Sequence, residues 1–113
     1  MSLLTVTARS AATGPVLEVA GELDHMTAPD LRRAVHHLAL VAGQLLVLDL
    51  TNLEFCDSSG ISALLAARNL ATEHGAGTAL AAVPAHITRI LRITGLDRVF
   101  TLHPDASTAT DPN

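Results

Sequence analysis

The chain has 113 residues and a net charge of −4, with 49% hydrophobic and 16% charged residues. This length fits a single domain, and this composition excludes a disordered chain. Seven basic residues and two aromatic residues supply neither a row of phosphate contacts nor stacking platforms, so we expect no direct nucleic-acid partner.

The single cysteine, Cys56, excludes an internal disulfide and a cysteine-rich metal site. The adjacent histidines His36 and His37 would point in different directions on a helix, so they do not form a chelating pair. We therefore expect no metal and no cofactor. The first residues lack the pattern of a secretory signal, and no apolar run approaches the ~20 residues that span a bilayer. The expected location is the cytoplasm, without membrane insertion.

The first half of the chain predicts a hairpin and a helix. Residues 4–8 and 16–20 alternate between apolar and polar side chains around a Gly-Pro turn sequence, a pattern typical of two antiparallel strands. Thr27 is predicted to cap the next helix, with Asp30 completing a weak capping box. Apolar residues at helical spacing extend this helix to Gly43.

The second half alternates strands with helices. A near-continuous apolar run at residues 45–50 predicts a strand buried on both faces. Residues 51–56 are predicted to be a loop, and an Ala-rich helix follows. A short strand at 78–83, a helix that stops at Gly95 and a short strand at 99–102 complete the pattern. The order β-β-α-β-α-β-α-β indicates parallel pairing through helical crossovers.

The most informative stretch is Asp57-Ser58-Ser59-Gly60, which precedes the Ala-rich helix. Asp, Ser and Gly favour the turn that starts a helix, where a side-chain oxygen accepts a hydrogen bond from a free backbone N–H. The helix N-terminus carries partial positive charge and unpaired donors. A hydroxyl there is well sited to carry a phosphate, and Gly60 leaves room for a partner to approach. Taken alone, the tetrapeptide also fits a plain loop and helix cap.

Three separated stretches resemble one known family. Residues 47–61, VLDLTNLEFCDSSGI, resemble the signature of the STAS domain, in which an aliphatic strand leads to F-x-D-S-S-G. Residues 21–28, GELDHMTA, resemble the G-E-L-D-x-x-T-A stretch of bacterial anti-sigma-factor antagonists, and residues 93–100, ITGLDRVF, resemble the closing pattern of that family. The resemblance covers residues 3–103 and leaves residues 104–113 as a polar tail that is predicted to be poorly ordered.

The resemblance implies an α/β fold: a single STAS domain with a four- to five-stranded mixed sheet and helices packed mainly on one face. It implies a regulatory binding protein rather than an enzyme. In such proteins the unmodified form binds an anti-sigma factor that is itself a serine kinase, and sigma is released. Phosphorylation, here of Ser58, ends that complex, and a serine phosphatase restores it. The resemblance also places a set of residues near the partner surface, namely Asp24, His25, Thr27, Asp57, Ser59, Gly60 and Ile61.

Several alternatives stay open. Ser59 could replace Ser58 as the phosphoacceptor, Asp57 could orient the acceptor loop or only cap the helix, and Thr27 could be a cap rather than a contact residue. STAS domains also occur as scaffold subunits of stress-signalling complexes and as soluble subunits of lipid transporters. A hydrolase is disfavoured because Ser58 lacks the G-x-S-x-G context. The sequence predicts no particular oligomeric state.

Overall fold

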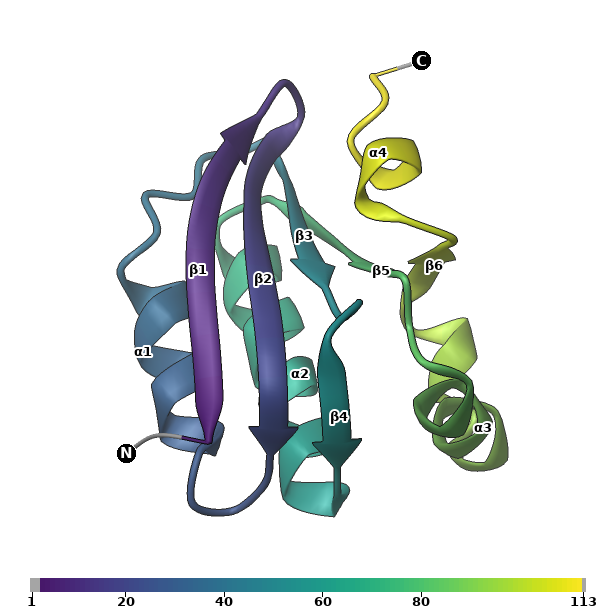
Figure 1. Ribbon diagram of the computed structural model, residues 1–113. Helices are drawn as coiled ribbons and strands as arrows, with labels where there is room; N and C mark the ends of the chain where they lie inside the picture. The colour runs from purple at the N-terminus through teal and green to yellow at the C-terminus, as the bar shows by residue number, and fades with distance from the viewer. Residues whose placement is uncertain (1–2, 113) are drawn as a thin grey trace.

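One mixed sheet of six strands, covered by helices, makes up the described part of the chain, residues 3–112 of a computed structural model (Figure 1). The strands are β1 (Leu4–Ala11), β2 (Gly14–Leu23), β3 (Leu45–Asp49), β4 (Leu53–Cys56), β5 (Gly77–Ala81) and β6 (Thr101–His103). The helices are α1 (Ala28–His36), α2 (Ser58–Glu73), α3 (Ala85–Thr94) and α4 (Ala106–Ala109), with a 3-10 turn, η1 (Leu96–Arg98), after α3. Within residues 3–112, no helix is both long enough and apolar enough to cross a membrane.

The long strand β2 has three partners in the sheet. All residues of β1 pair antiparallel with residues 14–21 of β2, which confirms the predicted hairpin. On the other side of β2, residues 16–18 pair in parallel with β3, and residues 21–23 pair in parallel with β4. The sheet continues from β3 through β5 to β6, and these strands are parallel. The end of β2 therefore lies beside β4 rather than beside β3.

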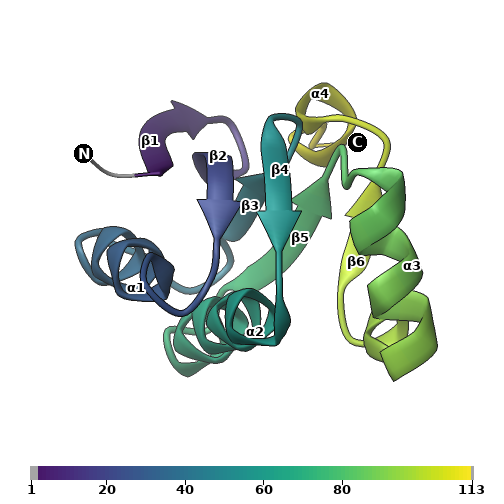
Figure 2. The same cartoon turned by 60° about the horizontal axis from the view of Figure 1, so that its bottom comes forward.

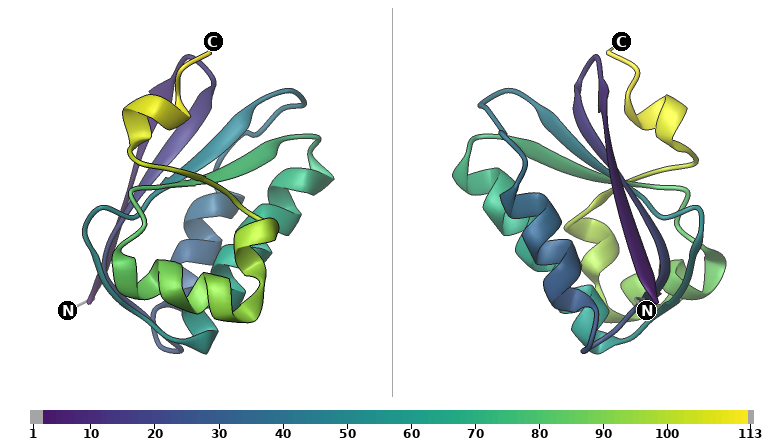
Figure 3. Two further views of the ribbon diagram at one scale, coloured as in Figure 1. Left: turned by 90° about the vertical axis from the view of Figure 1, so that its right-hand side faces the viewer. Right: turned by 60° about the vertical axis from the view of Figure 1, so that its left-hand side comes forward.

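Three of the helices pack on one face of this sheet. In Figure 2, α1 and α2 lie below the sheet, α3 lies on the same side toward the β6 edge, and α4 lies above. The two views in Figure 3 also place the sheet between α4 and the pair α1 and α2. Leu31 of α1, Leu64 of α2 and Leu91 of α3 are fully buried in one hydrophobic cluster. The prediction of an α/β fold with helices mainly on one face is confirmed.

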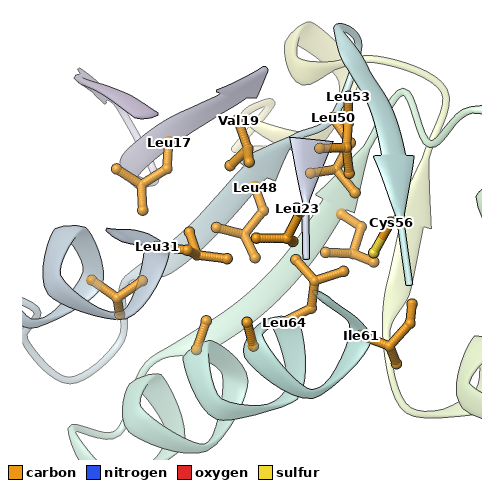
Figure 4. Packing of buried hydrophobic residues seen from close by; sticks show 14 of the residues in the cluster. Leu17, Val19, Leu23, Leu31, Leu48, Leu50, Leu53, Cys56, Ile61 and Leu64 are labelled. Atoms are coloured by element: carbon orange, nitrogen blue, oxygen red, sulfur yellow. The ribbon is translucent and has the colours of Figure 1, made fainter. Parts of the chain in front are cut away.

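The core between the sheet and these helices is aliphatic. Figure 4 shows Leu23 and Leu48 from the sheet pointing toward Leu64 of α2. Leu48 belongs to this cluster, whereas its neighbour Val47 belongs to a second cluster on the opposite face, so β3 is buried on both faces as its apolar run predicts. Asp49 ends this strand, and its carboxylate accepts hydrogen bonds from the N–H and the hydroxyl of Thr51.

A short helix covers part of the second face of the sheet. The tail, residues 104–113, was predicted to be poorly ordered, but it contains α4. Ala106 and Ala109 of α4 pack against Val47. The carboxylate of Asp105 caps this helix by accepting a hydrogen bond from the backbone N–H three residues later, and this bond lowers the pKa of Asp105. The small alanines allow α4 to lie close to the sheet.

Two other elements differ from the sequence predictions. Residues 51–56 were predicted to be a loop, but β4 lies within them and adds one strand to the four or five expected. This strand has only four residues and no alternation of burial, and its partner is the distant end of β2. The predicted helix toward Gly43 ends already at His36. The chain leaves the helical path there, and Leu40 enters the hydrophobic core.

Gly21 lies at the point where β2 turns toward β4. The register of the pairing shifts between Gly21 and Glu22. The φ angle of Gly21 is +100°, and a Cβ atom there would lie 2.1 Å from the carbonyl oxygen of Leu3. The N–H of Glu22 donates to that same oxygen at 2.9 Å, and the N–H of Gly21 donates to the carbonyl of Asn52 at 3.0 Å. Any side chain at Gly21 would therefore push apart the strands that position β4.

We expect Gly21→Ala to lower the free energy of unfolding by about 2–5 kcal/mol, since it combines a positive φ with a backbone clash. Gly43→Ala is the matched control, because Gly43 has a φ of +87° but no atom beyond its own and the adjacent residues within 4 Å of its Cβ position. The control should lose only about 1–2 kcal/mol. Urea denaturation of both variants gives the comparison, and equal losses would contradict the proposed clash.

Candidate functional site

The ends of β2 and β4 bring two loops together at one edge of the sheet. These strands are parallel, and Leu23 lies opposite Cys56. Residues 24–27 follow β2, and residues 57–60 follow β4. The N–H of Asp57 also donates to the carbonyl of Leu23 at 3.4 Å. The structure thus joins the two stretches that the sequence analysis had identified separately.

Asp57 is the N-cap of α2. Its Oδ1 accepts a hydrogen bond from the N–H of Gly60 at 3.0 Å, and its carbonyl accepts one from the N–H of Ile61 at 2.9 Å. The backbone of Asp57 is extended, as expected for a residue that precedes a helix. Of the two interpretations of Asp57, helix capping is therefore the one that the geometry supports.

Ser58 and Ser59 are the first two residues of α2, and they differ in exposure. Ser58 is exposed, whereas Ser59 is half-buried. Within residues 3–112 neither hydroxyl has a hydrogen-bond partner. A hydroxyl that is modified by another enzyme must reach that enzyme's active site, so Ser58 is the better placed of the two.

Gly60 and Ile61 are buried beneath the two serines. A Cβ atom on Gly60 would lie 2.5 Å from the carbonyl oxygen of Leu23 and 2.6 Å from the Sγ of Cys56. Ile61 is 7% exposed and belongs to the core cluster. The sequence analysis expected Gly60 to leave room for a partner, but the space is taken by β2 of the same chain. Gly60 instead allows α2 to begin close to the sheet.

The loop after β2 is held by hydrogen bonds between Asp24 and Thr27. The Oδ1 of Asp24 accepts from the N–H groups of Met26 and Thr27 at 2.9 and 3.1 Å. The hydroxyl of Thr27 donates to the carbonyl of Glu22 at 2.8 Å and accepts from the N–H of Asp24 at 3.0 Å. Thr27 precedes α1, but its side chain makes no capping hydrogen bond to that helix. Thr27 thus occupies the predicted N-cap position of α1, but its buried side chain fixes the loop rather than capping the helix.

His25, Met26 and Phe55 project outward beside these fixed backbones. His25 is exposed, Met26 is 80% exposed and Phe55 is 46% exposed. The sequence analysis did not select Met26 or Phe55. The available signal was an apolar residue within each of the two stretches that resemble the family. Neither residue belongs to an apolar pattern of a helix or of a buried strand. Exposed apolar side chains that form a contiguous patch are typical of a binding surface.

A hollow of about 270 Å³ lies between the beginnings of α1 and α2. It joins His25 of the first loop to Ser59 of the second, two residues that the sequence analysis placed near a partner surface. We call it the α1–α2 hollow, and it is lined by His25, Ala28, Pro29, Arg32, Ser59 and Ser62.

Cys56 lies next to the two serines but is not a reactive group. Its thiol is buried, and burial followed by the nearby charge of Asp57 raises its pKa to about 12. Among residues 3–112 no group of His, Cys, Asp and Glu side chains could hold a metal ion. The polar groups at this edge of the sheet are therefore the hydroxyls of the two serines, the imidazole of His25, the guanidinium of Arg32 and the carboxylates of Asp24 and Asp57.

Comparisons with known proteins agree on one family. A family model described as "Mlab, STAS domain" matches residues 6–103. The chain is similar to an anti-sigma F factor antagonist of Paenibacillus polymyxa, with 32% identity over 90 residues that make up 78% of this chain and 76% of that protein. The crystal structure of an anti-sigma factor antagonist from Mycobacterium paratuberculosis is similar with a TM-score of 0.79 and 31% identity, over 95% of this chain and 93% of that chain.

A third relative is more distant. The anti-sigma factor antagonist SpoIIAA of Bacillus, in its unphosphorylated form, has a TM-score of 0.74 at 19% identity, over 93% of this chain and 92% of that chain. A likeness at this identity demonstrates a shared fold alone. The same protein has also been solved in a phosphorylated form.

We expect Asp57→Ala to lower the free energy of unfolding by about 1 kcal/mol, because the first turn of α2 loses its cap. Asp57→Asn is the matched control, since an amide oxygen can accept the same hydrogen bond from Gly60. Urea denaturation measures both variants. A loss in Asp57→Asn as large as that in Asp57→Ala would argue that the charge, and not the cap, stabilises the helix.

We expect the thiol of Cys56 to resist alkylation by iodoacetamide at pH 8 in the folded protein. A group with a pKa of about 12 is protonated at this pH, and the thiolate is the reacting species. In urea the thiol regains an ordinary pKa and should react within minutes to hours, which intact-mass measurement would detect. Rapid alkylation of the folded protein would contradict the burial of this residue.

Proposed function

The chain belongs to the STAS domain family, and we propose that it acts as an anti-sigma factor antagonist that is switched by phosphorylation of Ser58. The observation that carries this proposal is the exposed, unbonded hydroxyl of Ser58 at the first position of α2. It lies where the loops after β2 and β4 meet, so a group added to it would enter any interface built on that edge. The relatives named as antagonists of anti-sigma factors supply the class of partner.

In this proposal the chain is a regulatory binding protein and not an enzyme. Its unmodified form binds an anti-sigma factor that is also a serine kinase, and this binding releases sigma in the cytoplasm. The kinase then phosphorylates Ser58 and the complex dissociates, until a serine phosphatase removes the phosphate. The partner surface includes the exposed side chain of His25 in the first loop and the half-buried side chain of Ser59 at the beginning of α2.

The charge of the phosphate supplies the physical basis of the switch. A phosphoserine carries about −1.5 to −2 charges at neutral pH. It would join Asp24 and Asp57, whose carboxylates lie in the two adjoining loops. The N-terminus of α2 offsets part of this repulsion inside the free protein, by about 1 kcal/mol. The fold should therefore tolerate the modification, while a bound partner meets concentrated negative charge.

We expect Ser58→Ala to bind the anti-sigma factor normally but to take up no phosphate from a cognate kinase and ATP. Ser58→Asp should weaken that binding at least tenfold, about 1.4 kcal/mol, because it mimics part of the added charge. The free energy of unfolding of Ser58→Asp should change by less than about 0.5 kcal/mol, since the residue is exposed. Intact mass gives the phosphate count, titration calorimetry gives the affinity, and urea denaturation gives the stability.

Asn69→Asp is the matched control for charge, because Asn69 is an exposed residue farther along the same helix. It should bind like the unmodified chain. Phosphorylation that persists in Ser58→Ala would move the acceptor, with Ser59 as the next candidate. An unchanged affinity in Ser58→Asp would refute the electrostatic switch.

A second candidate function keeps the fold and changes the partner. The matching family model is described as "Mlab, STAS domain", and STAS domains also serve as soluble subunits of lipid transporters and as scaffolds of stress-signalling complexes. Affinity purification of the chain from its native cells separates these functions. Recovery of a serine-kinase anti-sigma factor supports our proposal, whereas recovery of transporter or scaffold components without such a kinase would replace it.

A further inference from the structure

The α1–α2 hollow beside Ser58 contains a positive charge that the protein itself does not neutralise. Within residues 3–112 the guanidinium of Arg32 has neither an ion pair nor a hydrogen bond, and the side chain is exposed. The next residue, Arg33, differs because it forms a hydrogen-bonded ion pair with Asp30. Arg32 is therefore a free cation at the edge of a cavity in a protein of net charge −4.

The other polar groups around the α1–α2 hollow are also able to donate hydrogen bonds. Ser59 and Ser62 contribute hydroxyls, His25 contributes an imidazole, and no Asp or Glu lines the hollow. The buried Ala28 also lines the hollow. A guanidinium together with hydroxyl donors is the chemistry that proteins use to hold carboxylates and phosphates.

We infer that the α1–α2 hollow receives a carboxylate side chain, an Asp or Glu of the bound anti-sigma factor, which pairs with Arg32. This inference rests on the proposed function, since it names a recognition element for the same partner. A partner at this edge must approach within contact distance of Ser58, and Ser59, the next residue, lines the hollow. An acidic side chain complements the one unpaired cation that the described part of the site presents.

In the proposed switch, phosphorylation of Ser58 lowers the affinity for the partner, and this direction supports a carboxylate in the hollow. This chain is already negative, so a partner that docked with cations alone would bind more tightly after Ser58 gained a phosphate. For the affinity to fall, the phosphate must repel a negatively charged group on the partner. A phosphate on Ser58 would repel a carboxylate in the α1–α2 hollow and would also compete with it for Arg32.

The test compares Arg32→Ala with Arg33→Ala, using the anti-sigma factor that co-purifies with the Ser58→Ala chain as the probe. Titration calorimetry should show at least a tenfold loss of affinity for Arg32→Ala and less than a twofold loss for Arg33→Ala. Arg32→Lys should lose less than Arg32→Ala, since it keeps the charge without the planar fork. Because all these residues are exposed, thermal denaturation should give nearly the same midpoint for each variant and the parent chain.

A second arm identifies the partner group. Each Asp and Glu on the anti-sigma factor's docking face is replaced by Asn or Gln, and the affinities are measured with the parent chain and with Arg32→Ala. One carboxylate should couple to Arg32, so that its replacement costs little once Arg32 is gone. The penalty of Ser58→Asp should also shrink in the Arg32→Ala chain, because the repelled carboxylate is then bound less firmly.

The outcomes separate this inference from the proposed function. If the parent chain binds normally and Arg32→Ala and Arg33→Ala have equal affinities, the inference of a carboxylate in the hollow is wrong. The proposed antagonist function is not contradicted by that result. Arg32 sensitivity without coupling to any partner carboxylate would also overturn it and would point to another anion, such as a phosphate. If the parent chain binds no anti-sigma factor, the proposed function fails first and this inference fails with it.

Discussion

The site depends on the close approach of the first turn of α2 to the end of β2. Gly60 makes this approach possible, because its Cα lies where a Cβ would be 2.5 Å from the carbonyl oxygen of Leu23. β2 reaches this position only because it exchanges β3 for β4 as its neighbour at Gly21. Two glycines with different constraints, a positive φ at Gly21 and a lack of space at Gly60, therefore bring the two loops to one edge of the sheet (Figure 1).

The backbones of these loops are fixed before any partner binds. Asp57 and Asp24 each accept backbone hydrogen bonds, and the buried hydroxyl of Thr27 closes the first loop. A prearranged surface loses little conformational entropy on association, which favours affinity without a large contact area. The carboxylates of Asp24 and Asp57, which the sequence analysis placed near the partner surface, thus stabilise the loop backbones. Arg32, which the sequence analysis assigned to no site, has no ion-pair or hydrogen-bond partner within residues 3–112.

The sequence predicted most of the fold because its signals are local. The alternation in the first hairpin, the apolar run that became β3 and the glycine that ends α3 can all be read within a few residues. β4 and α4 could not be read in this way, since each is four residues long and is stabilised by strands far away in the chain. The partners of the Thr27 hydroxyl could not be predicted for a related reason. The position of Thr27 fits a helix cap, but its hydroxyl is taken by the carbonyl of Glu22 and the N–H of Asp24.

Part of the candidate site was predictable because its sequence signals are also local. The serines and the cap lie in one continuous stretch, so Ser58 and Asp57 could be placed at a helix start from sequence. The α1–α2 hollow depends on the packing of α1 against α2, and no sequence pattern reports the distance between them. Nothing in the sequence distinguishes Arg32 from its neighbour Arg33. Only the structure distinguishes it from Arg33, whose charge Asp30 already neutralises.

The first turn of α2 contains both an exposed residue that can be modified and buried residues that stabilise the fold. Successive helical residues point about 100° apart, so one turn presents Ser58 to solvent while Gly60 and Ile61 are buried. Figure 4 shows Ile61 among the buried hydrophobic residues. The nearby thiol of Cys56 is protonated as well as buried, so it adds no charge to this turn at neutral pH. A phosphate on Ser58 would therefore add its charge at an exposed position, and the N-terminus of α2 would offset part of its repulsion with the carboxylates of Asp24 and Asp57. The phosphate should therefore destabilise a complex at the adjoining surface more than it destabilises the fold. Under this condition a modification can change the affinity for a partner while the domain stays folded.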